Sequence, residues 1–473
     1  MDPRTLQFVL DVTEGECLRG EASSMIARVQ TDSRRVQPGD LFVALRGERF
    51  DGHDYIEEVV RRGAAAVLID RTMSGVVPPG SIAVIAVRDT RQALGLLGAR
   101  YRAGFQIPMI AVAGSNGKTS VKELLATVLG AGYRVIASEA SFNNDLGVPQ
   151  TLLRMVARDE IAVLEVGTNH PGELGPLLKM IRPRIGVLTS LGREHLEHFG
   201  DLQGVIAEEG VLAESISSEG LMVVNSDSPG VEQVIGRASC RVLRVGFASA
   251  SDWKIVSVTG DADGSDVEIE GGGVGWTGMW RVNLLGRHMA INAVLALAVA
   301  AELGLSPRLA RIGLAGARPS KMRLNAGEAG GVRILDDTYN ANADSVLAAL
   351  ETLTDLPCAG RRVAVLGDMA ELGCHAEAAH VEVGNAAARL AVDRLWTVGS
   401  RATVTADAAR QAGMQAAEAH PNLESVVRSM IEFLRPGDAV LVKASRSARL
   451  ERLVESLRAQ LGGGVTALAA VLV

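Results

Sequence analysis

The sequence predicts an α/β protein of three domains. A chain of 473 residues holds about three domains at roughly 150 residues each. Two long regions alternate short apolar runs, typical of buried parallel strands, with stretches whose apolar residues recur at helical spacing. We therefore expect a small mixed α/β domain over 1–88, a central parallel-sheet domain over 89–317, and a doubly wound, Rossmann-like α/β domain over 318–473.

The central region is built around one glycine-rich turn. Met109–Ala113 is a short apolar run before the turn, and helical spacing begins after it at Thr119 or Ser120. A strand, a glycine turn, Gly-Lys-Thr and a helix are the layout of a phosphate-binding loop, or P-loop. In such a loop Lys118 reaches the terminal phosphates of ATP, and the Thr119 hydroxyl ligates Mg²⁺. The candidate ATP-binding residues of the loop are Gly114, Ser115, Asn116, Gly117, Lys118, Thr119 and Ser120.

This match to the phosphate-loop pattern is imperfect, because the usual pattern has a glycine where this chain has Val112. The alternative is an ordinary glycine turn that happens to precede a lysine. The strand before the turn and the helix after it favour the phosphate-loop interpretation, since that context is what the motif requires.

Polar side chains follow two further strands of the predicted central sheet. Ile161–Gly167 contains Glu165 near its end, and Ile185–Ser190 leads into a loop that holds His195 and His198. Ligands bind outside the carboxyl ends of parallel strands, so Glu165 is a candidate Mg²⁺ ligand and either histidine could bind a metal. The alternatives are a buried salt bridge for Glu165 and ordinary surface histidines.

Two polar loops are candidates for substrate recognition. One lies in the first region, where Leu41–Leu45 and Ala64–Ile69 predict strands, and the other precedes an apolar helix start in the central region. Loops on a rigid scaffold often carry binding residues, but the same residue types also cap and solvate turns. The candidates are Asp32, Ser33, Arg34, Asn143 and Asn144.

The second half of the chain continues the alternation. We expect a β-rich layer over 253–283 and an apolar helix before the third domain. The predicted strands of that domain are Arg333–Leu335, Arg362–Leu366, Leu395–Val398 and Ala439–Arg446. No glycine-rich phosphate loop accompanies them. The last helix has an apolar face over 450–461, and we expect the apolar tail after Gly464 to dock on this domain or to fray.

Composition narrows the possible partners. The net charge of −7 argues against a nucleic-acid-binding surface. The chain begins without an apolar signal segment, and no apolar run is long enough for membrane insertion. Its four cysteines are scattered, without metal-ligand spacing, which is typical of a reducing compartment. We therefore expect a cytoplasmic protein.

Over its whole length the chain resembles the Mur ligases of peptidoglycan synthesis. The loop Gly114–Thr119 is similar to the ATP loop of this family, which characteristically lacks the first glycine. Ala343 and Ala444 depart from the family, which usually has Pro and Gly there. The other stretches similar to the family are Asn143–Pro149, Asp336–Ser345, Gly367–Gly373 and Lys443–Arg446. The first two of these are most like the branch that adds D-alanyl-D-alanine.

The resemblance implies a task for each domain. The first would hold the UDP end of UDP-N-acetylmuramoyl-tripeptide through the loop 32–34. The middle domain would bind ATP and Mg²⁺, with His195 as the metal-site histidine. The third would close over ATP and admit D-alanyl-D-alanine, and we expect a monomer. The resemblance also implies further contacts to ATP. Asn292 would lie near the adenine, Arg323 near the phosphates, and Asp337 and Asn340 near the ribose.

The implied reaction is ATP-dependent amide bond formation. A carboxylate does not couple with an amine unaided, because its oxygen is a poor leaving group. Transfer of the γ-phosphoryl group to the tripeptide carboxylate gives an acyl phosphate, which the amine of D-alanyl-D-alanine attacks. Two anions must first be brought together, so positive charge is the main requirement. Lys118, and Mg²⁺ on Thr119, Glu165 and His195, would supply that charge.

One departure from the family concerns the metal site. In most Mur ligases a lysine on the helix after the histidine motif is carbamylated and helps to hold a second Mg²⁺. An ungapped alignment puts Glu209 at that position. We predict that Glu209 serves as the metal-site anion without modification, although its side chain is ~3–4 Å shorter than a carbamylated lysine. A bridging water, a shifted helix or Glu208 would make up the difference; the alternative is a solvated helix residue.

Three other functions are weighed against this one. A folate polyglutamate-type ligase shares the ATP loop, but the segment 32–53 resembles the first domain of Mur ligases. A P-loop kinase or NTPase would not need the large third domain. A non-catalytic nucleotide-binding homologue would not be expected to keep Lys118, Thr119 and Glu165 intact.

Overall fold

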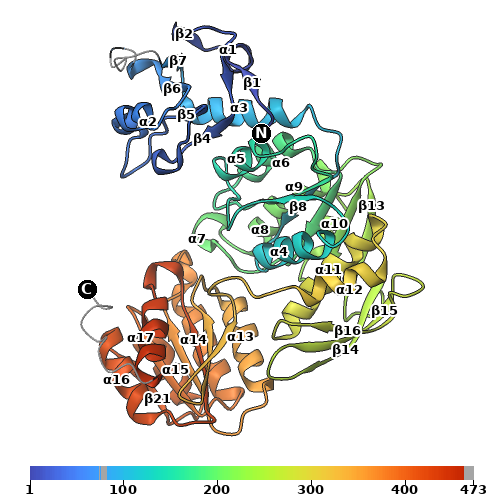
Figure 1. Cartoon of the computed structure of the whole chain (residues 1–473). Helices are drawn as coiled ribbons and strands as arrows, with labels where there is room; N and C mark the ends of the chain where they lie inside the picture. Colours follow the sequence, from blue (N-terminus) through green and yellow to red (C-terminus); the bar gives the residue numbers. More distant parts are fainter. Residues whose placement is uncertain (74, 76–81, 463–473) are drawn as a thin grey trace.

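The computed structural model describes residues 1–73, 75 and 82–462. Its three main sheets follow one another along the chain and form an open arc, with the N-terminal sheet at the top of Figure 1 and the C-terminal sheet at the lower left. Each sheet is covered by helices, as expected for α/β domains. The predicted α/β fold class is confirmed, and the apolar tail after Gly464 lies outside the described residues.

The N-terminal sheet has the strand order β2-β7-β6-β5-β4, and all neighbours are parallel except β2 and β7. The two strands predicted in this region are β5 and β6, with ends shifted by one or two residues. The elements are β1 (Arg4–Thr5), α1 (Leu6–Thr13), β2 (Glu16–Arg19), β3 (Met25–Ile26), β4 (Arg28–Gln30), η1 (Ser33–Arg35), β5 (Asp40–Val43), η2 (Gly52–Tyr55), α2 (Ile56–Arg61), β6 (Ala66–Asp70), η3 (Arg71–Met73) and β7 (Ala83–Val87).

Helix α3 (Thr90–Arg102) joins the N-terminal and central sheets. Asp89 caps it by accepting from the backbone N–H groups of Arg91 and Gln92, which satisfies two of the free donors at a helix start. Its buried residues, such as Leu94 and Leu97, belong to one apolar cluster that continues from the first sheet into the central one. The predicted boundary between residues 88 and 89 falls just before this helix.

The central sheet has nine strands in the order β16-β15-β14-β13-β12-β11-β8-β10-β9. The antiparallel strands β14 to β16 form the β-rich layer predicted over 253–283. The elements are β8 (Met109–Ala113), α4 (Lys118–Leu129), β9 (Val135–Ala137), α5 (Gly147–Leu153), β10 (Ile161–Glu165), α6 (Leu174–Ile181), β11 (Ile185–Leu188), α7 (Leu196–Phe199), α8 (Leu202–Glu209), α9 (Val211–Ser215), β12 (Leu221–Asn225), α10 (Val231–Ile235), β13 (Arg241–Gly246), β14 (Trp253–Gly260), β15 (Ser265–Gly271), β16 (Gly278–Val282), α11 (Arg287–Glu302) and α12 (Pro307–Ala315).

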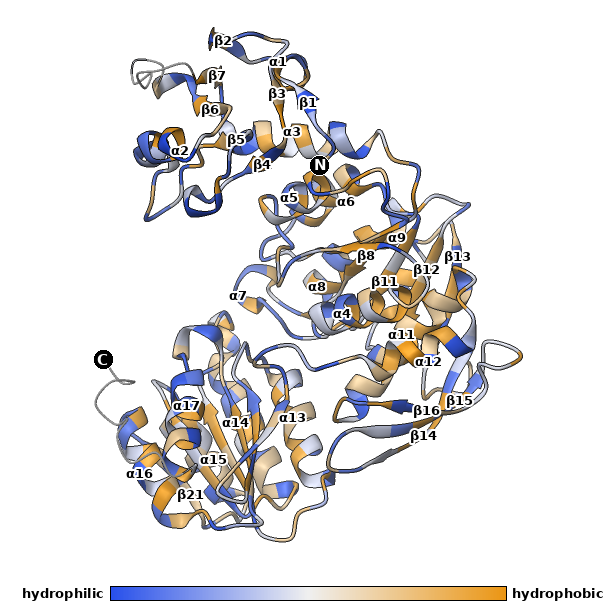
Figure 2. Ribbon diagram, viewed as in Figure 1, coloured by the Kyte–Doolittle hydropathy of each residue, from blue (hydrophilic) through white to orange (hydrophobic). Residues whose placement is uncertain are grey.

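Both faces of the central sheet are apolar and covered. In β8, Ile110 and Val112 belong to an apolar cluster with residues of α4 and α11, while Met109 and Ala111, on the opposite face, belong to one with residues of α3 and α6. Figure 2 shows these inner strands in the colour of hydrophobic residues. This two-sided burial explains why the strand is a continuous apolar run in the sequence rather than an alternating one. It also fixes the carboxyl end of β8, where the glycine-rich turn begins.

The C-terminal sheet has the order β17-β18-β22-β19-β20-β21, and only β17 is antiparallel. The edge strands β17 and β21 were not predicted. The elements are β17 (Asn325–Ala329), β18 (Val332–Asp337), α13 (Ala343–Asp355), β19 (Arg362–Gly367), η4 (Gly373–His375), α14 (Ala376–Arg389), β20 (Arg394–Val398), α15 (Ala402–Gln411), β21 (Ala417–His420), α16 (Leu423–Phe433), β22 (Ala439–Lys443), η5 (Arg446–Ala448) and α17 (Glu451–Leu461).

The C-terminal domain contacts the central domain directly. Arg193, from the loop after β11, forms ion pairs with Asp344 and Glu382 at 2.6 Å each. The amide of Asn342 donates to the side-chain oxygen of Asn116 in the glycine-rich turn, at 3.0 Å. The C-terminal domain is therefore docked on the strand ends of the central sheet.

Two further expectations concern the chain as a whole. No helix among the described residues is both long and apolar enough to cross a membrane. All four cysteines are free thiols, and none is fully buried: Cys17 and Cys374 are exposed, and Cys240 and Cys358 are half-buried.

Candidate active site

The glycine-rich turn has the backbone of a phosphate-binding loop. Gly114 and Gly117 have φ values of +117° and +88°, a region that favours glycine. A Cβ on Gly114 would lie 2.6 Å from the Thr189 hydroxyl, and one on Gly117 would lie 2.9 Å from the Asn292 side chain. Helix α4 begins at Lys118, one or two residues earlier than predicted, and no side chain among the described residues caps its first turn. Its free N–H groups can therefore face an anion.

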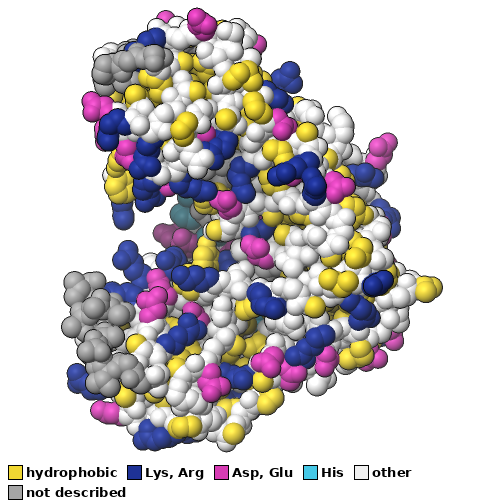
Figure 3. Space-filling view, in the orientation of Figure 1, with side chains coloured by type: hydrophobic (Ala, Val, Ile, Leu, Met, Phe, Trp, Pro, Cys, Tyr) yellow, Lys and Arg dark blue, Asp and Glu magenta, His cyan; other side chains and the backbone are white. Residues whose placement is uncertain are grey.

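A cavity of about 440 Å³ opens over this loop. The ends of β10 and β11, the start of α11, and the segment 337–345 of the C-terminal domain complete its walls. Figure 3 shows the surrounding hollow, with Lys and Arg side chains on both rims and acidic and histidine side chains at its back. The cavity thus lies at the carboxyl ends of parallel strands, where α/β proteins bind ligands.

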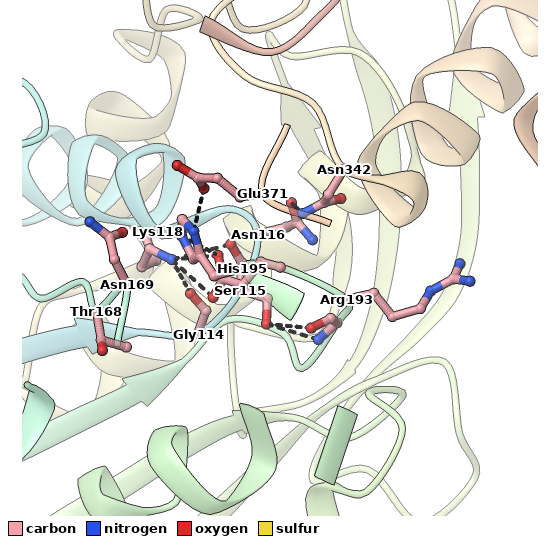
Figure 4. Close-up of polar contacts among 12 residues, drawn as sticks. Gly114, Ser115, Asn116, Lys118, Thr168, Asn169, Arg193, His195, Asn342 and Glu371 are labelled. Carbon is pink, nitrogen blue, oxygen red and sulfur yellow. Dashed lines mark hydrogen bonds and ion pairs between the residues drawn. The ribbon is translucent and has the colours of Figure 1, made fainter. Parts of the chain in front are cut away.

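Lys118 is held inside this loop by oxygen atoms. Its ammonium donates to the backbone carbonyls of Gly114 and Ser115, and it lies 3.2 Å from the carboxylate of Glu194 (Figure 4). Burial alone would lower the pKa of Lys118, but the nearby carboxylates of Glu194, Glu209 and Glu165, in that order, raise it above its usual value. The ammonium is therefore charged.

Buried carboxyl groups outnumber the buried ammonium around Lys118. Burial raises the pKa of Glu194 in spite of its ion pair with Lys118. Burial likewise raises the pKa of Glu209 from its usual 4.5 to about 8, although Lys118 opposes the shift. One ammonium thus faces three carboxylates, and a further cation would stabilise their ionised forms.

Glu165 lies at the carboxyl end of β10 and is 1% exposed. One of its oxygens accepts from the amide of Asn143 at 2.8 Å, and the other has no hydrogen-bond partner among the described residues. The alternative of a buried salt bridge for Glu165 is therefore wrong. A buried carboxylate oxygen without a donor is what an oxygen-binding cation requires.

The two candidate histidines differ in position. His195 lines the cavity, and its Nε2 lies 3.8 Å from Glu194 while its Nδ1 lies 2.5 Å from Glu371 of the C-terminal domain. His198 is exposed and packs on His170, with ring centroids 4.1 Å apart. The geometry therefore favours His195 over His198 as a metal-site candidate.

Glu209 is buried near the end of α8, at 1% exposure, so the alternative of a solvated helix residue is wrong. Neither oxygen of Glu209 accepts a hydrogen bond from a donor among the described residues. The backbone N–H of Gly114 is near this carboxylate but does not have hydrogen-bond geometry to it. Glu208 has a different task, because its carboxylate accepts from the backbone N–H groups of Gly172 and Leu174. Glu209 is thus the unpaired carboxylate of the two.

Residues from the C-terminal half line the opposite wall of the cavity. Arg323 donates to the Thr119 hydroxyl at 3.2 Å and stacks over the ring of Tyr339. Asp337 accepts from Lys443 at 2.6 Å, and the same ammonium donates to the carbonyl of Asn340. Asn292, which packs on the glycine-rich turn, also lines the cavity. The structure therefore brings all four implied ATP contacts to one site.

The two predicted substrate loops lie in different domains, 32–34 in the N-terminal domain and 143–144 in the central domain. Asp32 caps the short helix η1, which contains Ser33, and forms an ion pair with Arg34. Asn144 accepts from two backbone N–H groups at the start of α5. It is therefore a turn residue, which is the alternative to substrate binding given above for this loop. Asn143 differs, because it lines the cavity through its contact with Glu165.

Two site residues were not proposed from the sequence. Glu194 directly precedes His195, so its place after a strand was an available signal. Glu371 lies about 180 residues further along the chain, and only the docking of the C-terminal domain brings it to His195.

The residues present fit Mg²⁺ as part of a nucleotide complex. Within the described residues, no three His, Cys, Asp or Glu side chains converge closely enough to hold a metal by themselves. Mg²⁺ is usually held by one or two protein oxygens together with phosphate oxygens and waters. Oxygen ligands of this kind are present here: the unpaired carboxylate oxygens of Glu165 and Glu209, and the Thr119 hydroxyl.

Comparison with known proteins agrees with this geometry. Residues 25–102 match the family profile described as "Mur ligase family, catalytic domain", residues 112–300 the "Mur ligase middle domain", and residues 322–446 the "Mur ligase, glutamate ligase domain". The UDP-N-acetylmuramoyl-tripeptide--D-alanyl-D-alanine ligase of Escherichia coli (strain K12) is 35% identical, over 96% of this chain and 98% of that protein.

Solved structures are similar over the same length. MurF from Acinetobacter baumannii superposes with a TM-score of 0.87 at 30% identity, over 97% of this chain and 99% of that one. The MurF ligase from Thermotoga maritima in complex with ADP has a TM-score of 0.79 at 27% identity, over 92% and 97% of the two chains. The agreement extends over all three domains, and the chain belongs to the Mur ligase family.

Proposed function

We propose that this chain is an ATP-dependent ligase that joins D-alanyl-D-alanine to UDP-N-acetylmuramoyl-tripeptide. The product would be the UDP-linked pentapeptide precursor of peptidoglycan. The observation that supports this most is one cavity in which the phosphate loop, its lysine and the buried carboxylates of Glu165 and Glu194 meet residues of the docked C-terminal domain. Relatives named for this activity, matched over nearly their whole length, support the choice of substrates.

The first step would transfer the γ-phosphoryl group of ATP to the carboxylate of the tripeptide. The bond between the γ-phosphorus and the bridging oxygen breaks, ADP leaves, and a carboxylate oxygen bonds to phosphorus. Lys118 and the N-terminus of α4 would offset the charge of the phosphates as the two anions approach. Arg323, at the Thr119 hydroxyl, would add a second cation to the same face of ATP.

In the second step, the amine of D-alanyl-D-alanine would attack the carbonyl carbon of the acyl phosphate. A tetrahedral intermediate forms, phosphate leaves with one of the original carboxylate oxygens, and the amine loses a proton. The acyl phosphate must be kept from water, and the C-terminal domain, docked through Arg193 and Asn342, would cover it.

Thr119, Glu165, His195 and Glu209 would hold Mg²⁺ together with the phosphates. When bound, Mg²⁺ neutralises phosphate charge and orients the transferred group. Glu165 would in turn be oriented by Asn143, whose amide contacts it at 2.8 Å. The carboxylate of Glu209 would take the place of the carbamylated lysine of related enzymes.

We further propose that the UDP end of the substrate binds at Asp32, Ser33 and Arg34. This turn faces the central domain, because the Thr31 hydroxyl contacts Gln150 of α5 at 3.2 Å and Arg35 pairs with Glu139. The tripeptide would then extend from the turn toward Asn143 and the cavity. We expect the enzyme to act in the cytoplasm, because its two nucleotide substrates are cytoplasmic metabolites. We also expect it to be a monomer.

Phosphate release in the presence and absence of each substrate tests this function. We expect ADP and phosphate to form only when UDP-tripeptide and D-alanyl-D-alanine are both present, with D-alanine alone a poor acceptor. Mass spectrometry of the product should show the pentapeptide. Preference for a single amino acid such as L-lysine or glutamate as acceptor would place the chain in another branch, including the folate type. Substrate-independent ATP hydrolysis would favour an NTPase.

A further inference from the structure

His195 contacts a carboxylate from another domain. Its Nδ1 lies 2.5 Å from a carboxylate oxygen of Glu371, which is in the loop between β19 and η4 (Figure 4). The two atoms are close, but Nδ1 has no partner with hydrogen-bond geometry among the described residues. The opposite nitrogen, Nε2, faces Glu194 and the phosphate loop.

Both residues have an unusual backbone conformation. His195 has a φ of +48° and Glu371 a φ of +59°, in the left-handed region that non-glycine residues rarely occupy. Such conformations persist where the surrounding structure holds them and concentrate at functional sites. Here they direct two side chains from different domains at each other.

The loop that carries Glu371 is docked on the histidine loop by its backbone as well. The N–H of Glu197 donates to the carbonyl of Glu371 at 3.0 Å. A second contact, at 2.7 Å, joins His375 Nε2 to the carbonyl of Gly200. The position of the Glu371 carboxylate is therefore set by the docking of the C-terminal domain.

A carboxylate beside a histidine ring is a common arrangement at metal sites. Histidines that bind a metal through one ring nitrogen commonly donate the N–H of the other to a carboxylate, which fixes the tautomer and raises the basicity of the ligand. Glu371 is the carboxylate placed to accept from His195.

We propose that Glu371 is a positioning residue for the metal site: it holds His195 as the Nδ1–H tautomer, with Nε2 free toward the phosphate loop. This inference rests on the proposed role of His195. Because Glu371 belongs to the C-terminal domain, the metal ligand is oriented only when that domain is docked. Domain closure and assembly of the metal site are then one event.

The first test reads the tautomer of His195 directly. The full chain is labelled with ¹⁵N-histidine, and the His195 signals are identified by their loss in His195→Ala. In the wild type, long-range ¹H–¹⁵N correlations should show Nδ1 protonated and Nε2 free. In Glu371→Ala this pattern should give way to a mixture of tautomers, whereas Glu377→Ala, an exposed site on the next helix, should keep it. An unchanged tautomer in Glu371→Ala would overturn the inference.

The second test measures Mn²⁺ affinity by electron paramagnetic resonance, with a non-hydrolysable ATP analogue bound. We expect Glu371→Ala to weaken Mn²⁺ binding by about 10- to 100-fold, the range for loss of such a partner, and Glu371→Gln to lie between it and the wild type. Glu377→Ala should change it less than twofold. In a His195→Ala background, Glu371→Ala should add no further loss.

The outcomes separate the two claims. If His195→Ala weakens Mn²⁺ binding and Glu371→Ala does not, the role of Glu371 is wrong and the proposed metal site stands. If His195→Ala leaves Mn²⁺ binding unchanged, the metal role of His195 fails and the inference fails with it. Additive losses in the double variant would also overturn it, because Glu371 would then act without His195.

Discussion

Replacing Lys118 with alanine is expected to lower kcat more than 100-fold while the chain stays folded. Lys118 is the cation that faces the phosphates at the start of α4, and removal of one such donor typically costs that much. Its loss also leaves the carboxylates of Glu194, Glu209 and Glu165 without their shared counter-charge. ATP turnover with both substrates gives kcat, and circular dichroism reports the fold.

A matched control for this variant is Lys254→Ala. Lys254 forms an ion pair with Glu270 on the β14–β15 hairpin, where both side chains are partly exposed, so its removal should leave kcat unchanged. Near-normal turnover in a folded Lys118→Ala enzyme would show that the phosphate site has been placed wrongly.

Replacing Glu209 with glutamine is expected to lower activity at least tenfold and to raise thermal stability. Loss of activity follows if the carboxylate helps to hold Mg²⁺. Stability should rise because burial lifts the pKa of Glu209 from 4.5 to about 8. The folded chain then binds this proton more tightly than the unfolded chain, so the wild type loses stability as pH rises between these values. Glutamine carries no charge and avoids that loss.

Melting temperatures at several pH values, without Mg²⁺ or ATP, measure this effect. The advantage of Glu209→Gln should grow from about pH 5 to about pH 8 and then level off. Glu208→Gln is the control, because Glu208 accepts from two backbone N–H groups and its substitution should lower the melting temperature. Full activity of Glu209→Gln, or stimulation of the wild type by bicarbonate in CO₂-free buffer, would contradict the assignment.

The sequence was sufficient for the part of the site that depends on local structure. Lys118, Glu165 and His195 each follow a short apolar run, and the end of a buried parallel strand places a polar residue at the ligand edge of the sheet. The burial of Glu209 could not be read in this way. It depends on how α8 packs beneath the phosphate loop, and a helical glutamate is usually solvated.

The missed strands of the C-terminal sheet have physical reasons of their own. Strands β17 and β21 read Asn-Ala-Gly-Glu-Ala and Ala-Glu-Ala-His, without β-branched or aromatic residues. They lie at the two edges of their sheet. An edge strand pairs with a neighbour on one side alone, so a high strand propensity matters less there. The contact between Glu371 and His195 depends on domain docking, which leaves no local pattern in the sequence.

The central claim, ligation through an acyl phosphate, is tested most directly by isotope transfer. UDP-tripeptide labelled with ¹⁸O in both oxygens of its reacting carboxylate is incubated with ATP and D-alanyl-D-alanine, and both products are analysed by mass spectrometry. We predict that the released phosphate carries one ¹⁸O atom per turnover and that the new amide keeps the other, because a carboxylate oxygen becomes the bridge to phosphorus. Unlabelled phosphate, or phosphate formed without the pentapeptide, would contradict the account.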